Sequence, residues 1–434
     1  MELVLKTSGQ KCLAGSNPAP SAEGGIMALN GTPVARHGAQ SERHPWSLIV
    51  RIIGLAMVTL LVSGVAVGGL VFWKLNSSID KVSLVGEGET QLNLSSIGSY
   101  DGGFNILIVG SDTRQGQDGS FGSFSSELND VNLLVHVAED HQSAVVVSIP
   151  RDMVVPIPSC PMEDGSGNYA AMSAQPINVA LSYGGLACAV LTVENLTGLD
   201  IPYAGLVTFK GVAQLSTAIG GVDVCVDGPI DDKYTGLYFP EAGNYTIEGY
   251  DALAFLRSRH GVGDGSDLGR ISSQQQYMSS LVRKVQDEGV LSDITKLYSI
   301  AQVAATSMSL SNSLAGLDVM VAMALVLKEI PRENIVFVQY PGTTGVGGVY
   351  AGKVAPVESL ATALFDKIRA DEPFTLAGDA TGVGSTQVDD TTESGSTETP
   401  APESTDSGTS SAATDELEGV LGQTADQYTC SVAN

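Results

Sequence analysis

An uncharged apolar run at residues 52–73 constrains the organisation of this chain most. The run has 22 residues, and about 20 apolar residues are enough for a helix to cross the hydrocarbon core of a bilayer. Trp46 stands before the run and Trp73 at its end, as aromatic side chains do at membrane interfaces. A cleaved signal peptide is the alternative, but the run is longer than a typical signal-peptide apolar region and lies far from Met1. We therefore expect a transmembrane helix at 52–73.

The charge before this run predicts its orientation. Residues 1–51 carry five Lys and Arg against three Glu, a net charge of +2. Positively charged flanks stay in the cytoplasm, so we expect 1–51 to be a cytoplasmic, disordered tail, rich in Gly, Ala, Ser and Pro. Met27 is an alternative start to Met1. The rest of the chain is then extracytoplasmic, in a single-pass protein of the cell membrane.

Composition excludes one broad class of function. Asp and Glu number 48 against 22 Lys and Arg, so the net charge of the 434 residues is -26. Proteins that bind nucleic acids normally present a basic surface to the phosphates, so no nucleic-acid partner is expected. Hydrophobic residues make up 43% of the chain, which is enough to build a folded core.

Apolar runs rich in Val and Ile predict strands buried on both faces. Helical patterns lie between and after these runs, which predicts an α/β domain with a central, mostly buried β-sheet between helices. We place this domain at 101–372, after a linker or short edge segment at 74–100. Residues 373–434 lack Lys and Arg and are expected to form a disordered, acidic, Ser/Thr-rich tail. The predicted strands are 104–109, 131–138, 144–149, 220–226 and 335–340, and the predicted helices are 188–196, 209–218, 271–286, 294–308, 314–328 and 357–369.

Four of the five cysteines fall in the part expected outside the membrane, where disulfides form. No pair has CxxC spacing and no His cluster accompanies them, so a zinc site is not expected. Four cysteines allow three pairings. We expect Cys160 to pair with Cys188, which closes a short loop, and Cys225 to hold the tail at Cys430. The sequence leaves the other pairings open.

Basic residues are scarce after the membrane run, yet four arginines fall in tight polar settings. Arginine binds phosphate or carboxylate through two parallel hydrogen bonds, so such a group favours an anion site. Structural ion pairs would explain any one of them alone. Residues two apart on an extended segment point to the same side, and one pair has this spacing. The four are Arg151 in SIPRD, Arg257 and Arg259 in LRSRHG, and Arg270 in GDGSDLGR.

Two aspartates are candidate metal ligands. Asp112 follows the first predicted strand in GSDTR, and Asp130 precedes the second in LNDVNLL. Two carboxylates beside a phosphate suit Mg²⁺, which binds one or two protein carboxylates together with substrate oxygens. A single Asp after a strand is more often a turn former. His136 lies in an apolar run and is expected in the core, whereas His260 adjoins Arg259 and is a candidate supporting group.

The Gly-rich segment 261–269 is a candidate phosphate cradle, but a flexible loop is the simpler interpretation. It matches neither a P-loop nor a dinucleotide fingerprint. The chain has no GxSxG and no HExxH, so serine-hydrolase and zinc-protease mechanisms lack support.

An ordered series of motifs carries a family resemblance. The motifs FNILIVGSDTR, SIPRDMVVPIP, INVALSYGG, GLVTFKGVAQL, AIGGVDVCV, DDKYTGLYFPEAGNYTIEGYDALAFLRSRHG and GDGSDLGRISSQQQ occur in this order. Together they resemble the LytR-CpsA-Psr family in its actinobacterial form, strongly over 101–285 and weakly to about residue 370. The resemblance implies a central sheet between helices with a hydrophobic pocket for a polyprenyl chain.

The same resemblance implies a transferase of the bacterial envelope. Family members move a glycopolymer from an undecaprenyl-pyrophosphate carrier to peptidoglycan and form a phosphodiester link. It implies catalytic roles for Arg151 and Asp112, and a Mg²⁺ or Mn²⁺ site at Asp112, Asp130 and Asp267.

The resemblance also assigns the groups that bind the pyrophosphate. Leu128 and Ser273 stand where family members often have arginine, so two positive charges are absent. Either the neighbouring arginines suffice or the polymer differs. The pyrophosphate-binding residues implied are Arg151, Arg257, Arg259, Arg270 and Gln274, with Arg114 at a further family position.

Phosphoryl transfer depends mainly on positioning and electrostatics, and the arginines and metal would supply both. Two other functions stay open on the sequence, a polyprenyl-phosphate-binding scaffold and an envelope regulator, each without transferase turnover. A pyrophosphatase side activity, with water in place of the sugar hydroxyl, is a further alternative.

Overall fold

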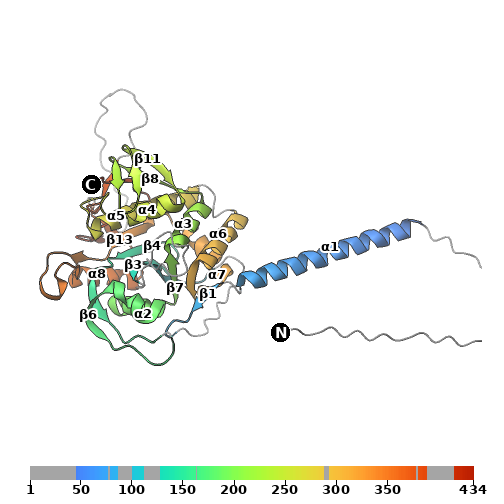
Figure 1. Ribbon diagram of the computed structural model, residues 1–434, viewed down its shortest axis with the longest axis horizontal. Coiled ribbons are helices and arrows are strands. Elements are labelled where there is room, and N and C mark those ends of the chain that lie inside the picture. The colour runs from blue at the N-terminus through green and yellow to red at the C-terminus, as the bar shows by residue number, and fades with distance from the viewer. Residues whose placement is uncertain are drawn as a thin grey trace, which may run out of the picture. The chain divides into compact units, whose positions relative to one another are not determined.

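The computed structural model describes residues 45–76, 79–86, 100–111, 128–162, 164–287, 293–377, 380–388 and 415–434 (Figure 1). The chain forms two compact units, Met1–Val67 and Gly68–Asn434. The predicted cytoplasmic tail at 1–51 lies outside the described residues except for 45–51. The choice between Met1 and Met27 stays a prediction.

Helix α1, Pro45–Asn76, contains the whole predicted run at 52–73. Its described apolar side chains, such as Leu60 at 75%, are exposed. Among the described residues, Ile177–Thr197 is the helical stretch that is long and apolar enough to span a membrane. However, 61% of this stretch is buried, as in a core helix. The apolar helix Ile49–Gly64 is shorter than a membrane span requires. A helix at 52–73 is therefore found, and its place in a membrane stays a prediction.

The central sheet of the second unit has eight strands in the order β1-β12-β7-β2-β3-β4-β13-β19. It is mixed: β2 and β3 are antiparallel, as are β3 and β4, whereas β2 with β7 and β4 with β13 are parallel. The strands are β1 Asp80–Val82, β2 Phe104–Ser111, β3 Asn129–Val137, β4 Ala144–Ile149, β7 Tyr203–Thr208, β12 Met308–Ser311, β13 Ile335–Gln339 and β19 Gly422–Thr424.

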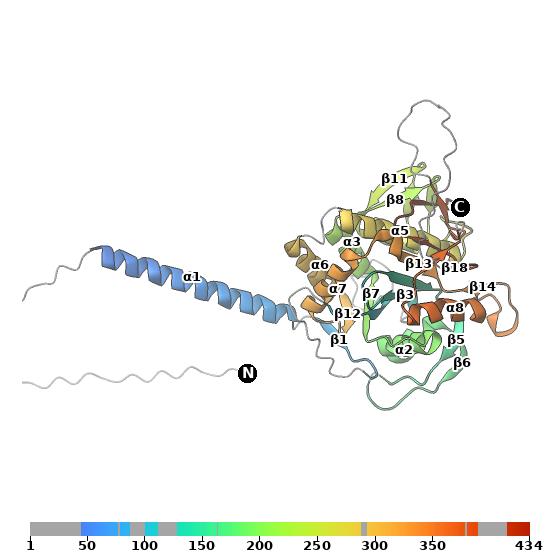
Figure 2. The same cartoon turned by 180° about the vertical axis from the view of Figure 1, so that it is seen from behind.

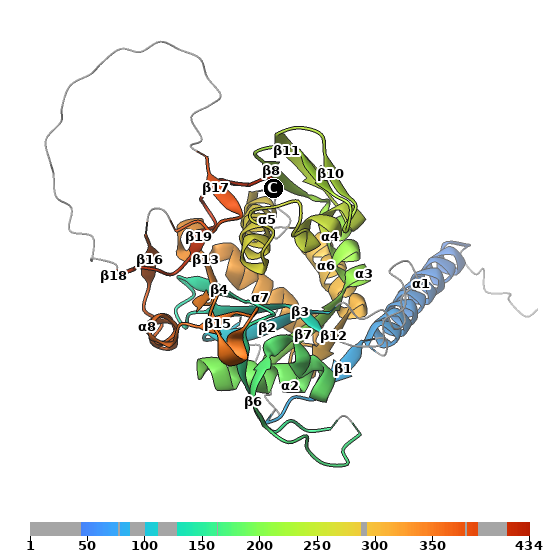
Figure 3. The same cartoon turned by 60° about the vertical axis from the view of Figure 1, so that its left-hand side comes forward.

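Alternate residues of the apolar strands fill two separate cores, because successive side chains of a strand point to opposite faces. Val145 and Val147 of β4 belong to one core, with α2 (Ala180–Thr197) and α8 (Glu358–Arg369). Val146 belongs to the other, with α6 (Ile294–Ser307) and α7 (Leu317–Glu329). Figures 2 and 3 show these helix pairs on opposite sides of the sheet. The expected sheet between helices is therefore confirmed.

A second, four-stranded sheet has the order β11-β8-β20-β17. The apolar run at 220–226 forms β8 of this sheet, so it is a strand as predicted but lies outside the central sheet. Helices α4 and α5 enclose its core through Phe255 and Tyr277. The bounds are β8 Val222–Val226, β11 Gly243–Ile247, β17 Ser385–Gln387, β20 Thr429–Ser431, α4 Gly249–Arg257 and α5 Asp267–Asp287.

Short elements complete the domain. They are β5 Val154–Ile157, β6 Met172–Pro176, α3 Phe209–Ile219, β9 Ile230–Asp232, β10 Leu237–Phe239, β14 Gly342–Thr343, β15 Ala355–Pro356, β16 Phe374–Leu376 and β18 Asp415–Leu417, with 3-10 turns at Ile177–Val179, Arg332–Asn334 and Gly348–Tyr350.

The predicted boundary at 372/373 is wrong for the described residues of the tail. β19 pairs with β13 at one edge of the central sheet, and β20 pairs with β17 and β8 of the second sheet. An open strand edge presents unpaired N–H and C=O groups that another segment can satisfy. These three-residue strands are too short for a sequence pattern to reveal. Similarly, β1 pairs with β12, so the segment at 74–100 contributes an edge strand.

Two disulfides join Cys160 to Cys188 and Cys225 to Cys430, the pairings expected from the sequence. The first ties the loop after β5 to α2. The second joins β8 to β20 across a sequence separation of 205 residues, so it fastens the C-terminal strand to the second sheet.

Candidate functional site

A cavity of about 470 Å³ lies between the central sheet and helices α3, α4 and α5. Helix α3 contributes Val212, Leu215 and Ile219, which share one helix face because they stand three or four residues apart. Helix α4 adds Leu253 and Leu256. The wall of the cavity is mostly apolar.

Helix α5 gives the cavity a polar and an apolar end. Arg270 and Gln274 line it near the start of the helix, and Met278 and Leu281 line it further along. At 1.5 Å per residue, Arg270 and Leu281 are separated by about 16 Å along the helix axis. A ligand with a charged head and an apolar tail matches this gradient.

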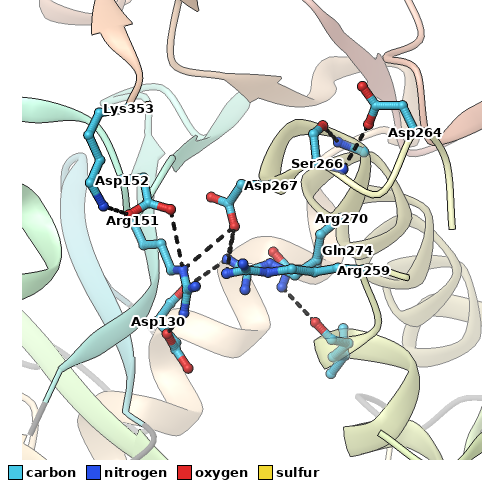
Figure 4. A network of polar contacts seen from close by, with 12 residues as sticks. Asp130, Arg151, Asp152, Arg259, Asp264, Ser266, Asp267, Arg270, Gln274 and Lys353 are labelled. Carbon is cyan, nitrogen blue, oxygen red and sulfur yellow. Dashed lines mark hydrogen bonds and ion pairs between the residues drawn. The ribbon is translucent and has the colours of Figure 1, made fainter. Parts of the chain in front are cut away.

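Asp267, at the start of α5, gathers three arginines at the polar end (Figure 4). Its Oδ1 lies 2.7 Å from Arg270 Nη2, 3.2 Å from Arg259 Nη2 and 3.7 Å from Arg151 Nε. The Asp267 side chain is only 8% exposed. Three of the four predicted arginines thus meet around one buried carboxylate.

Strand register brings Asp130 to Arg151. Asn132 of β3 pairs with Ile149 of β4, so two residues further on Asp130 comes opposite Arg151. Arg151 Nη1 donates to Asp130 Oδ1, and Arg270 Nη2 donates to the Asp130 carbonyl oxygen at 3.0 Å. Adjacent antiparallel strands therefore explain why residues 21 apart in sequence form one site.

Arg151 and Arg270 stay charged at neutral pH. Burial lowers the pKa of Arg270 to about 10; Asp267 opposes this effect, and the neighbouring Arg259 and Arg151 add to it. Burial also opposes the charge of Arg151, but the carboxylates of Asp130, Asp267 and Asp152 together outweigh it and raise the pKa. The Nε–H groups of Arg151 and Arg270 are buried and find no hydrogen-bond acceptor in the described part of the chain. Buried donors are normally paired, so these suit an anionic ligand.

Arg257 and Gln274 also line the cavity. Arg257 ends α4, and its guanidinium carbon lies 4.0 Å from the centre of the Phe209 ring. Arg257 and Arg259 therefore do not share one extended segment, because the helix ends between them. Gln274 Nε2 donates to the Leu256 carbonyl at 2.8 Å, which satisfies a backbone acceptor at the end of α4.

Asp112 and Arg114 lie outside the described residues, directly after β2. The last residue of that strand, Ser111, lines the cavity. Of the two positions where family members often have arginine, Ser273 is fully buried, and its hydroxyl donates to the Gly384 carbonyl at 3.4 Å. The segment around Gly384 covers α5 there, so an arginine at 273 has no room. Nothing in the structure explains Leu128.

The acids of the site differ in how well they suit a metal ion. Within the described ranges, no three or more His, Cys, Asp or Glu side chains come together in a group that could hold a metal ion. Asp130 lines the cavity and fits a single carboxylate ligand of Mg²⁺, which takes its other ligands from substrate and water. Asp267 is surrounded by three guanidinium groups, and these contacts favour a role in holding the arginines.

Two residues beside the site, Asp152 and Lys353, carry no sequence signal of their role. Asp152 Oδ1 accepts a hydrogen bond from Lys353 Nζ at 2.6 Å, 201 residues away. Asp152 Oδ2 lies 3.8 Å from Arg151 Nε, so Lys353 joins the same network.

The C-terminal residues hold the Gly-rich segment that follows Arg259. Gly263 N donates to the Val432 carbonyl at 2.8 Å, and Asn434 N donates to the Gly261 carbonyl at 3.2 Å. Val262 forms a β-bridge with Ala433. The segment predicted as a flexible loop is therefore fixed by backbone hydrogen bonds at its first residues.

Comparisons with known proteins agree with this architecture. The LytR_cpsA_psr family model matches residues 72–365. The chain is 28% identical to cell wall biosynthesis protein LcpA of Corynebacterium glutamicum over 363 residues, 77% of this chain and 67% of that protein. It is 27% identical to polyisoprenyl-teichoic acid–peptidoglycan teichoic acid transferase TagT of Bacillus subtilis over 243 residues, 54% of this chain and 70% of that protein.

A solved structure shares the fold. The crystal structure of protein gbs0355 from Streptococcus agalactiae matches with a TM-score of 0.50 and 21% identity, over 62% of this chain and 88% of that chain. The family model covers more than half of the residues and includes the strands and helices that build the cavity. This chain belongs to the LytR-CpsA-Psr family.

Proposed function

We propose that this protein is a membrane-anchored, extracytoplasmic phosphotransferase that moves a glycopolymer from an undecaprenyl-pyrophosphate carrier to peptidoglycan. The observation that carries the proposal is the cavity along α5, with arginines at one end and apolar side chains at the other. Relatives named as teichoic acid transferases support it.

The two ends of the cavity suit the two ends of such a carrier. The polyprenyl chain gains about 25 cal/mol for each Å² of apolar surface that leaves water. The pyrophosphate carries concentrated negative charge, which Arg151, Arg259 and Arg270 neutralise at the polar end. Helix α1 would keep the site close to the membrane that contains the carrier.

The proposed reaction is an in-line displacement at the phosphorus on the glycan side. A peptidoglycan sugar hydroxyl forms the new O–P bond, and the bond from that phosphorus to the bridging oxygen breaks. Undecaprenyl phosphate leaves, and the hydroxyl proton passes to a carboxylate, for which Asp112 is our candidate. Arg151, oriented by Asp130, stabilises charge on the phosphate oxygens.

We also propose that Mg²⁺ or Mn²⁺ assists. Asp130 and the predicted ligand Asp112 would hold it beside the pyrophosphate. When bound, the ion supplies positive charge to phosphate oxygens.

A reconstituted assay tests the proposal. Purified full-length protein in detergent is mixed with undecaprenyl-pyrophosphate-linked glycan, peptidoglycan and Mg²⁺, and both coupled glycan and released undecaprenyl phosphate are measured. Arg151→Ala should abolish coupling while the melting temperature shows that the protein is folded. Arg332→Ala, which changes an arginine paired with Asp287 outside the cavity, is the matched control.

The outcome separates the proposal from its alternatives. Release of undecaprenyl phosphate without coupled glycan would indicate a pyrophosphatase. Binding of the carrier without any release would indicate a scaffold. Normal coupling by Arg151→Ala would remove this arginine from the mechanism.

A further inference from the structure

Two aromatic rings stand at the mouth of the cavity. The rings of Tyr234 and His260 lie 4.5 Å apart between centroids, at an interplanar angle of 41°. Both residues line the cavity, yet Tyr234 is 81% exposed and His260 is also exposed. An exposed tyrosine that borders a cavity presents its ring to whatever passes through the opening.

A buried carboxylate fixes this pair to the arginine segment. Asp232 is 1% exposed, and its Oδ1 accepts a hydrogen bond from the Tyr234 backbone N–H at 2.9 Å. Its Oδ2 accepts from the Ser258 hydroxyl at 2.7 Å. Ser258 stands between Arg257 and Arg259, so one side chain holds both the turn that carries Tyr234 and the segment that carries Arg259 and His260.

The sequence order sets the position of the rings relative to the phosphate groups. His260 directly follows Arg259, whose guanidinium belongs to the arginine cluster around Asp267. The rings therefore lie at the polar end of the cavity, on its solvent side. A ligand with its tail in the apolar part and its pyrophosphate at the arginines would place its next group beside them.

We propose that Tyr234 and His260 form a sugar-stacking subsite, which holds a pyranose ring next to the pyrophosphate. A pyranose presents C–H groups on its face and hydroxyls around its edge. Stacking removes the apolar face and the tyrosine ring from water together, while the hydroxyls stay hydrated. The inference rests on the proposed function and extends it to the carbohydrate.

The ring held there is either the first sugar of the carrier-linked glycan or the attacking sugar of peptidoglycan. Three probes separate these sources: geranyl pyrophosphate, geranyl-pyrophosphoryl-N-acetylglucosamine and a soluble, uncrosslinked peptidoglycan glycan strand. Binding of each to the full-length protein in detergent is measured by calorimetry.

The variants are chosen so that the fold is retained. Tyr234→Ala removes an exposed ring, and Tyr234→Phe keeps the ring without its hydroxyl. Tyr238→Ala is the matched control, because Tyr238 is 66% exposed and is not among the described residues that line the cavity.

We expect Tyr234→Ala to weaken binding of one sugar-bearing probe about tenfold, the loss expected when a stacked ring is removed. Binding of geranyl pyrophosphate should not change, and Tyr234→Phe and Tyr238→Ala should bind like wild type. Wild-type affinity of Tyr234→Ala for all three probes, or an equal loss for all three, overturns the subsite. If the wild-type protein binds no pyrophosphate probe, the proposed function itself fails.

Discussion

Asp267 and Arg270 stand one turn apart on α5, with Asp267 Oδ1 2.7 Å from Arg270 Nη2. Both side chains are less than a tenth exposed, at 8% and 6%. The same carboxylate faces Arg151 and Arg259, which come from other parts of the chain. Buried like charges repel each other strongly, so Asp267 is the anion that lets three guanidinium groups gather before a phosphate arrives.

Asp267→Asn should therefore lower both the stability of the protein and its coupling activity. Removing one partner from a buried ion pair leaves the other charges uncompensated and costs about 3–5 kcal/mol. We expect a lower melting temperature and at least about a hundredfold slower coupling. Added inorganic pyrophosphate should raise the melting temperature more in the variant than in wild type, because it replaces the missing anion. Equal increases would contradict this role for Asp267.

Leu281→Gln tests the apolar end of the cavity. An amide placed among apolar side chains loses hydrogen bonds to water, and the leucine's own contribution to tail binding disappears. We expect the affinity for undecaprenyl phosphate to fall about tenfold, whereas inorganic pyrophosphate, which reaches only the arginines, should bind unchanged. A fluorescence titration with each ligand measures both affinities. An equal loss for the two ligands would mean that Leu281 acts through the fold.

The Cys225–Cys430 disulfide should matter for both stability and activity. It spans 205 residues, against 28 for Cys160–Cys188, and a longer loop loses more entropy when the chain is cross-linked. Replacing Cys225 and Cys430 by Ser should lower the free energy of unfolding by about 2–4 kcal/mol. Coupling should also fall at temperatures where the variant is folded, because Val432 and Asn434 hold the Gly261–Gly263 segment.

The matching change of Cys160 and Cys188 is the control for this prediction. It should lower stability by a smaller amount and leave coupling unchanged in the folded protein. Loss of coupling in proportion to unfolding in both variants would show that the C-terminal strand contributes stability alone.

His136 should make stability fall under mild acid. Its Nδ1 faces Asn105 Oδ1 at 2.8 Å and its Nε2 faces Asp371 Oδ1 at 2.9 Å. Burial lowers the pKa of His136 below its ordinary value, although Asp371 opposes the shift. As the pH falls, the unfolded state therefore takes up the proton before the folded state does. The contribution of neutral His136 to the free energy of unfolding is complete above about pH 6.5, and it is lost as pH falls through the folded-state pKa.

Denaturant midpoints between pH 7.5 and 5.0 measure this effect. We expect the midpoint to decrease with acidification in wild type, and the decrease to be smaller in His136→Asn, which has no titrating ring. Identical slopes in the two proteins would exclude His136 as the titrating group.

The structure confirms the longer of the predicted elements. The helical spacing at 271–286 reappears as α5, and the apolar run at 104–109 reappears as β2. Periodicity over several turns or residues reports directly on which side chains are buried. The strands β19 and β20 have three residues each, too few to carry a period, so the return of the C-terminus into both sheets could not be predicted.

The sequence by itself determined the residue types of the site: four arginines and two aspartates in unusual local settings, and the motifs that carry the family resemblance. Only the tertiary structure decided their partners. Asp267 meets Arg151, and Lys353 meets Asp152 across 201 residues, because strand register and helix packing fix those distances. An ion pair depends on separation in space, and a sequence motif records only separation along the chain.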